Sequence, residues 1–245
     1  MLLVSNLGKE KIALNRLAFL LTPQLYRWLL YGLFTGGLWG TQIDAAEQRA
    51  DKPTDAKSRQ VMERLQRFTD QLQTIEGDFV QQVDEDGSTT KRENSGHFVA
   101  SKPGRFRWDY QQPFQQLVLS DGREIWYYEP DLRQATRSTA RLLHETPAAF
   151  LVSGVRIADT FIWEVQPSGR WLAPTVHLKP KRDDKSVHEI AITLDPQQDR
   201  LLGLMVADTM GHRSWFTFSH VRLNQPVDAQ RFQFTPPAGV DIVHE

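Results

Sequence analysis

Residues 105–128, RFRWDYQQPFQQLVLSDGREIWYY, decide the fold. The first six alternate rings with charged side chains, and in a strand this puts the two kinds on opposite faces: Phe106, Trp108 and Tyr110 on one, Arg105, Arg107 and Asp109 on the other. Asp121-Gly122 marks a tight turn. The run that follows it, 124–128, is bulky on both faces. A sheet that is apolar on both faces is covered on both, or lines a cavity with one.

Similar runs of β-branched and aromatic residues, separated by turn formers, recur along the chain. They predict ten strands: 78–83, 95–100, 105–110, 116–119, 124–128, 161–165, 175–179, 188–194, 201–207 and 214–221. Short consecutive strands joined by tight turns form an antiparallel meander, and a sheet of about ten strands curls. We therefore expect a mainly β protein with a few helices. Its curved antiparallel sheet would form an incomplete, half-open β-barrel covered by α-helices.

Two helices are predicted beside the strands. Between residues 57 and 75 the apolar positions follow a 4, 3, 4, 3 spacing, which predicts an amphipathic helix ended by Gly77: Val61, Leu65, Phe68, Leu72 and Ile75. Further on, Thr146 and Pro147 begin a short apolar helix, 148–152, that stops near Gly154. Its place in the meander suits a lid over the barrel, and equally a corner helix that fills a gap.

The N-terminus is predicted to be a secretory signal, residues 1–45, followed by a single domain, residues 46–245. Arg27 precedes an uncharged run, 28–40, and the small residues Ala45 and Ala46 follow. This run is shorter than the roughly 20 residues that cross a bilayer, although an uncleaved anchor is the alternative. Residues 1–24 make an overlong n-region, which a mistaken start codon would explain. The expected location is the periplasm.

Composition excludes several functional classes. With 29 basic and 30 acidic residues the chain lacks the basic surface of a nucleic-acid binder. It has no cysteine, which removes thiol catalysis, thiolate metal sites and a lipidated N-terminal cysteine. His144-Glu145 and His188-Glu189 begin a zinc-protease pattern without the second histidine, and no nucleophile elbow or phosphate loop occurs. We expect no enzyme activity, no metal and no cofactor.

Three stretches closely resemble the family of periplasmic outer-membrane lipoprotein carriers, LolA: residues 101–113, 117–136 and 227–240. The resemblance extends from about Val61 to Val240. It implies an unclosed barrel over a hydrophobic cavity. It also implies a monomeric carrier that takes lipoproteins, by their acyl chains, from an inner-membrane ABC transporter to an outer-membrane receptor.

The expected site combines the strand pattern with this resemblance. The acyl-chain cavity would be lined by Phe98, Phe106, Trp108, Tyr110, Leu119 and Trp126. The lid would consist of Pro147, Phe150, Leu151 and Val152. In the family an arginine before a proline ties the lid shut through backbone carbonyls. This chain has Lys102 there, a donor without the planar guanidinium fork. Arg105 could replace it as the latch, and a solvated surface role for Lys102 is the alternative.

Four other interpretations remain at this stage. An enzyme acting on lipids would need a nucleophile–base pair that faces the cavity, but the serine, threonine and histidine residues lie scattered without one. The outer-membrane receptor of the same fold is anchored through a lipidated cysteine, which this chain lacks. A half-barrel regulatory or sensor domain would bind a protein partner instead of lipid. The rings could also form a simple packed core with no cavity.

Overall fold

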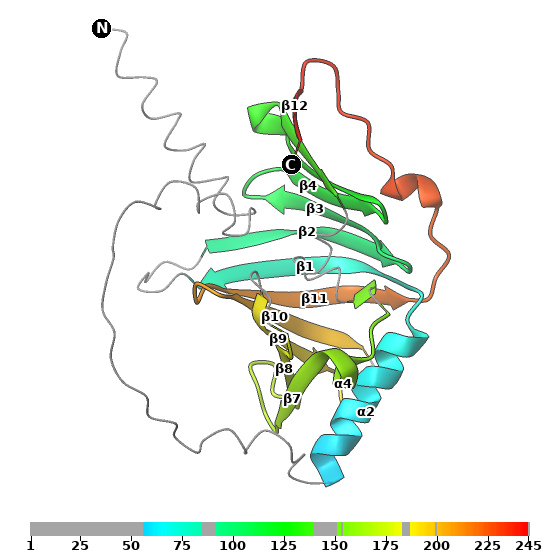
Figure 1. Ribbon diagram of the computed structural model, residues 1–245, viewed down its shortest axis with the longest axis vertical. Coiled ribbons are helices and arrows are strands. Elements are labelled where there is room, and N and C mark those ends of the chain that lie inside the picture. The colour runs from blue at the N-terminus through cyan, green and yellow to red at the C-terminus, as the bar shows by residue number, and fades with distance from the viewer. Residues whose placement is uncertain are drawn as a thin grey trace, which may run out of the picture. The chain divides into compact units, whose positions relative to one another are not determined.

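The computed structural model describes residues 56–84, 92–139, 151–152, 154–182, 187–198 and 200–244. The predicted signal peptide therefore lies outside the described residues. Strands dominate the described part, and Figure 1 shows them side by side in one sheet. They are β1 (Thr74–Asp84), β2 (Arg92–Ser101), β3 (Arg105–Gln112), β4 (Gln116–Asp121), β5 (Glu124–Glu129), β6 (Gln134–Thr139), β7 (Phe161–Gln166), β8 (Thr175–Pro180), β9 (Val187–Leu194), β10 (Leu201–Asp208), β11 (Arg213–Leu223) and β12 (Asp241–His244).

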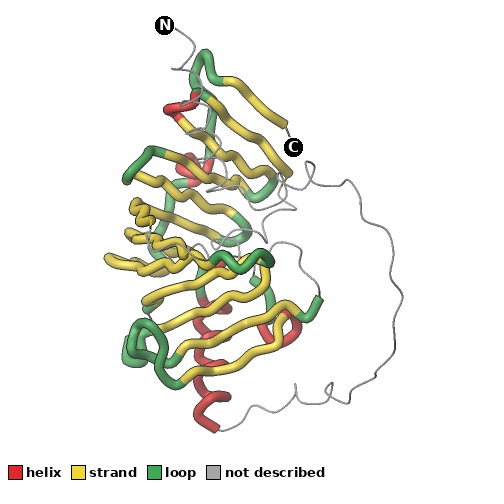
Figure 2. Tube along the Cα trace, turned by 90° about the vertical axis from the view of Figure 1, so that its left-hand side faces the viewer, coloured by secondary structure: helices red, strands yellow, loops and turns green. Residues whose placement is uncertain are grey.

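The sheet is open. Among the described residues its strand order is β12-β6-β5-β4-β3-β2-β1-β11-β10-β9-β8-β7, with β7 and β12 as the two edges. Neighbours are antiparallel except β12, which pairs parallel with β6. Figure 2 shows how the strand direction turns from one end of the sheet to the other. The prediction of a curved, incomplete antiparallel barrel with helices is confirmed.

All ten predicted strands are present, and two more were missed. β6 has the sequence QATRST, in which the two threonines give only a weak β signal among small and polar residues. β12 has four exposed residues and pairs with a strand about a hundred positions earlier. Such pairing cannot be detected by local pattern.

The helical elements are few. They are α2 (Ala56–Gln71), α4 (Ile157–Thr160) and the 3-10 turns η2 (Pro130–Leu132) and η4 (Ala229–Phe232). Leu65, Phe68 and Leu72 of the predicted stripe are buried. α2 packs against β7 and β8, as Figure 1 also shows.

The predicted end of the first helix was wrong. The helix stops at Gln71, and Ile75 is already in β1, where it pairs with Ala100 of β2. The Asn224 side chain accepts a hydrogen bond from the Gln73 amide at 2.7 Å and so fixes the junction. Gly77 does not end a helix. It lies at a bulge of β1, where a Cβ atom would stand 2.8 Å from the carbonyl oxygen of Ser219.

Different segments of the chain pack on the two faces of the sheet: α2 on one and η4 on the other. We call the face on which α2 lies the α2 face. The strand register and the pocket described below place one apolar row along it, from β8 to β4: Val176, Ile192, Leu204, Phe216, Phe79, Phe98, Trp108 and Val118.

The C-terminal segment covers part of the opposite face. Phe232 of η4 is buried there, close to β3 and β4. The ring of Phe234 lies 5.5 Å from that of Trp126 and 5.2 Å from that of Tyr128. The C-terminal segment therefore covers one face of β5, a strand that carries bulky residues on both faces.

Candidate functional site

Five rings from four strands form a buried cluster on the α2 face, which we call the aromatic cluster. Trp108 lies at its centre, with its ring centroid 4.7 Å from Phe79, 5.0 Å from Phe98 and 5.4 Å from Phe216. Phe218 completes the cluster at 5.0 Å from Phe98. All five side chains are buried. Rings at such separations attract one another beyond the area they bury.

Four of the six predicted cavity residues lie on this face. Phe98 and Trp108 belong to the aromatic cluster, Phe106 is fully buried beside them, and Tyr110 contacts Phe79 at 5.0 Å between centroids. The alternation predicted for β3 is therefore correct: its rings face α2 and its arginines do not. Whether these rings contact cargo remains a prediction.

Leu119 and Trp126 were assigned to the wrong face. Leu119 pairs directly with Arg107 on one side and with Trp126 on the other. Residues paired in this way project from the same face, so both lie opposite the aromatic cluster. There Trp126 packs against Phe234 and under the Arg137 guanidinium, 5.6 Å from the ring centroid.

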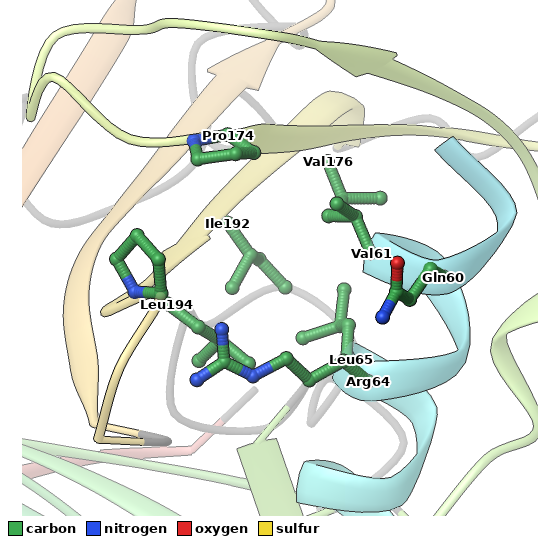
Figure 3. Close-up of a pocket in the computed structure, with 9 residues that line it drawn as sticks. Gln60, Val61, Arg64, Leu65, Pro174, Val176, Ile192 and Leu194 are labelled. Carbon is green, nitrogen blue, oxygen red and sulfur yellow. The ribbon is translucent and has the colours of Figure 1, made fainter. Parts of the chain in front are cut away.

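A pocket of about 340 Å³ opens between α2 and the strands β8 and β9. Figure 3 shows the side chains of α2 facing those of the strands across it. Its walls are mostly apolar, with two polar side chains from α2: Val61, Leu65, Pro174, Val176, Ile192, Leu194, Pro196, Gln60 and Arg64. Arg64 Nη2 donates to the Asp195 carbonyl oxygen at 2.5 Å. The sequence predicted the apolar helix stripe that contains Val61 and Leu65, but it did not predict this pocket, and none of the six predicted cavity residues lines it.

The pocket and the aromatic cluster lie on one face. Ile192 of the pocket wall pairs with Leu204, and Leu204 pairs with Phe216 of the cluster. These side chains project from the same face because directly paired residues do. The apolar surface is therefore continuous from α2 and β8 to Trp108.

The turn between β2 and β3 ties two helical segments to the sheet. Lys102 Nζ donates to the Thr69 carbonyl near the end of α2 at 2.5 Å, and the Lys102 amide donates to the Gln73 carbonyl at 2.9 Å. The Gly104 amide donates to the Val152 carbonyl at 3.4 Å. Burial lowers the pKa of Lys102, against the opposing effect of Asp70. Lys102 therefore fastens α2, whereas its neighbour Gly104 contacts the lid segment.

The other predicted lid and latch residues are only partly described. Leu151 and Val152 are helical and buried, and Gly154 follows with a φ of +67°. Pro147 and Phe150 lie outside the described residues. Arg105 projects from the opposite face, donates to Ser101 Oγ at 3.1 Å and stacks over the Phe232 ring at 5.4 Å. It therefore supports the C-terminal segment, and its role as a lid latch stays a prediction.

The contact of Lys102 with α2 leads to a stability prediction. Lys102→Met keeps the aliphatic stem but removes the donor to Thr69, and should lower the free energy of unfolding by about 1–2 kcal/mol. Lys102→Arg keeps a charged donor and should lose less. Urea denaturation followed by circular dichroism measures both. Equal stability of Lys102→Met and the parent would show that the side chain is merely solvated.

A charged cluster that the sequence did not reveal lies on the opposite face near the bulge. Its centre is Glu76, whose side chain is 14% exposed. Glu76 Oε1 lies 2.9 Å from Arg231 Nη1 and 3.1 Å from His97 Nε2. The six members, which come from β1, β2, β11 and η4, are Glu76, Asp78, His97, His220, Arg222 and Arg231. The cluster therefore fastens the C-terminal segment to the middle of the sheet.

Two searches of the described residues found nothing. No group of three or more histidine, aspartate or glutamate side chains there is arranged to hold a metal ion. No helix in the described ranges has the length and apolar character to cross a membrane.

Comparison with known proteins supplies the family. The family model for the outer membrane lipoprotein carrier protein LolA matches residues 70–235. The outer-membrane lipoprotein carrier protein of Methylococcus capsulatus is 33% identical over 184 residues, 74% of this chain and 86% of that protein. That of Chromohalobacter salexigens is 33% identical over 75% of this chain and 86% of its own length. A LolA superfamily crystal structure from Nitrosomonas europaea has a TM-score of 0.43 at 10% identity, covering 72% of this chain and 97% of that one. The chain belongs to the LolA family of outer membrane lipoprotein carrier proteins.

Proposed function

We propose that this protein is a periplasmic carrier that shields the acyl chains of lipoproteins, and that it is not an enzyme. The observation that carries the proposal is the apolar pocket under α2, which continues along the buried α2 face to the aromatic cluster. The similarity to outer-membrane lipoprotein carriers supports it. The predicted signal at residues 1–45 would deliver the chain to the periplasm.

Burial of apolar surface supplies the affinity. Each methylene exposed to water costs about 0.8 kcal/mol, so an acylated protein crosses an aqueous compartment only if its chains are covered. Noncovalent burial is reversible, and this allows cargo to be passed on without a chemical step. The partners would be lipoproteins, the inner-membrane lipoprotein-releasing ABC transporter and the outer-membrane receptor, with the carrier acting as a monomer.

The size of the pocket requires motion. Its volume of about 340 Å³ lies at the lower end of the range for drug-sized ligands, about 300–1,000 Å³. A cargo with several acyl chains fits only if the walls separate. We propose α2, the helical wall of the pocket, as the element that moves, and its hydrogen bonds with Lys102, Asp195 and Ile157 would have to break for it to do so.

The direct test is recovery of cargo. The protein is tagged, purified from periplasm, and the co-purifying material is identified by mass spectrometry. Acylated lipoproteins that are released by detergent and displaced by a fluorescent fatty-acid probe are the expected result. Recovery of unlipidated protein alone, with no probe binding, would refute the carrier and favour a domain that binds a protein partner.

A charge in the pocket should weaken binding. Val61 projects from α2 into the pocket and is only half-buried, so Val61→Asp should leave the protein folded. Because an acyl chain would have to desolvate the new carboxylate, we expect about tenfold or more weaker binding of the fatty-acid probe. Gln71→Asp adds the same charge at an exposed position of the same helix, outside the pocket. It is the control and should bind as the parent does. Equal loss in both variants would exclude the pocket as the acyl site.

A further inference from the structure

Trp108 has an unused hydrogen-bond donor in the middle of the sheet. Its side chain is 4% exposed, and its indole Nε1 has no hydrogen-bond acceptor among the described residues. Phe79 and Phe98 lie against its ring, and neither offers an oxygen. Buried donors are almost always paired, and an unpaired one is costly. A phenylalanine ring would fill this place in the cluster without leaving a donor unpaired. The presence of the indole N–H group therefore indicates an acceptor on a bound molecule.

The α2 face changes character at Trp108. Towards α2 the face is mainly apolar, with Phe216, Leu204, Ile192 and Val176 in one row and the buried Gln81 beside it, paired with Phe216. In the other direction, over β4 to β6, hydroxyl groups occupy the same face: Ser120, Tyr127, Thr136 and Ser138. Three of these, Ser120, Thr136 and Ser138, are buried. Trp108 therefore stands at the boundary between an apolar half and a hydroxyl-bearing half.

We propose that the Trp108 indole donates a hydrogen bond to the ester or amide carbonyl that joins an acyl chain to its head. The chain then lies over the apolar half towards the pocket, and the glyceryl and peptide head lies over the hydroxyl-bearing half. This assignment rests on the proposed carrier function and specifies how the cargo is oriented in it. Trp108 acts as a positioning residue.

The surroundings of Trp108 select a neutral acceptor. Its paired neighbours on this face, Phe98 and Val118, carry no charge, and an anionic head group in such surroundings would lack a counter-ion. Burial raises the pKa of Tyr110, the next ring along β3 on this face, so its hydroxyl stays neutral. A carbonyl oxygen is neutral, accepts one strong hydrogen bond and stands next to a long apolar chain. The ester and amide links of a lipoprotein have these properties together.

A matched pair of lipids tests the hydrogen bond. A diacylglycerol and the dialkyl glycerol ether of the same chain length differ in the carbonyl groups. The wild-type protein should bind the ester about three- to tenfold more tightly in displacement of a fluorescent fatty-acid probe, the gain of one net hydrogen bond. Trp108→Phe keeps a ring in the cluster and should bind both lipids equally. Trp126→Phe, on the opposite face, should keep the preference.

Indole resonances give a second measurement that does not depend on a variant's stability. The ¹H–¹⁵N spectrum of the mature protein, residues 46–245, contains the five tryptophan side chains of that range, and the one absent from Trp108→Phe belongs to Trp108. Its N–H proton should move downfield with the ester and not with the ether. An ester preference that persists in Trp108→Phe, or an unmoved Trp108 resonance, would overturn the assignment while leaving the carrier function intact. Failure of the wild-type protein to bind either lipid would overturn both.

Discussion

Phe98→Ala is expected to lower the free energy of unfolding by about 3–5 kcal/mol. Phe98 is fully buried, stacks on Trp108 and lies 5.0 Å from Phe218 between ring centroids. Removal of its ring deletes these contacts and leaves a cavity. The strands around the cavity cannot close it, because the backbone pairing of β1 with β2 holds Gly77, the partner of Phe98, and Ala100 in place. Urea denaturation monitored by tryptophan fluorescence and by circular dichroism measures the effect.

Phe114→Ala is the matched control. Phe114 follows β3 and is 49% exposed, so its loss should change the free energy of unfolding by less than about 1 kcal/mol. A double-mutant cycle of Phe98→Ala with Phe218→Ala should give a coupling of about 0.5–1.5 kcal/mol, the range for aromatic pairs. A Phe98→Ala protein as stable as Phe114→Ala would show that the cluster is loosely packed.

Glu76→Gln is expected to cost about 2–3 kcal/mol at neutral pH and to change the pH dependence of stability. Glu76 is the shared acceptor of three groups: Arg231 at 2.9 Å, His97 at 3.1 Å and Arg222 at 3.3 Å. The glutamine keeps the shape of the side chain but removes the charge that all three face. Charge-assisted contacts of a largely buried carboxylate are the stronger kind, so the loss exceeds that of an ordinary surface ion pair.

The pH dependence follows from the direction of two pKa shifts. Burial raises the pKa of Glu76, but hydrogen bonds from Arg231 and His97, with the charges of Arg231 and Arg222, more than offset this and lower it below its ordinary 4.5. Contacts with His97 and His220 lower the pKa of Asp78 below 3.8. A carboxyl with a lowered pKa stabilises the fold above its unfolded-state pKa and loses that contribution as the pH falls through the folded-state pKa.

Denaturation curves between pH 3 and pH 7 would test this linkage. The parent should lose stability as the pH falls below about 4.5, and Glu76→Gln should show a shallower acid limb because one of the two carboxyls is gone. Glu93→Gln, at an exposed position of β2, is the control and should keep the parent's acid limb. If the free energy of unfolding fell equally with pH in the parent and in Glu76→Gln, the charge of Glu76 would contribute nothing to folding.

The junction of the helix and β1 shows why one sequence prediction was wrong. The 4, 3, 4, 3 spacing continues to Ile75 as though the helix did too, but Ile75 is the second residue of a strand. Helical and extended backbones can both bury the same residue. The extended backbone is fixed by two residues distant in sequence: the Gln73 amide donates to the Asn224 side chain, and the Gln73 carbonyl accepts from the Lys102 amide.

The site was predicted in part for a related reason. Period-2 alternation fixed which residues of β3 share a face, and Trp108 and Phe106 are buried together on it. Alternation does not relate one strand to the next, so the face of Leu119 and Trp126 depended on the register between β3 and β4.

The sequence by itself determined ten of the twelve described strands, the presence of the amphipathic helix and the family, because hydrophobic periodicity, turn residues and family motifs are local properties of the chain. Only the tertiary structure decided which segments meet. It brought Val176 and Ile192 opposite α2 to form the pocket, brought Arg231 to Glu76, and gave the Trp108 indole no acceptor within the described part of the chain. Pairing register and the burial of a donor are relations between distant segments, and no local pattern encodes them.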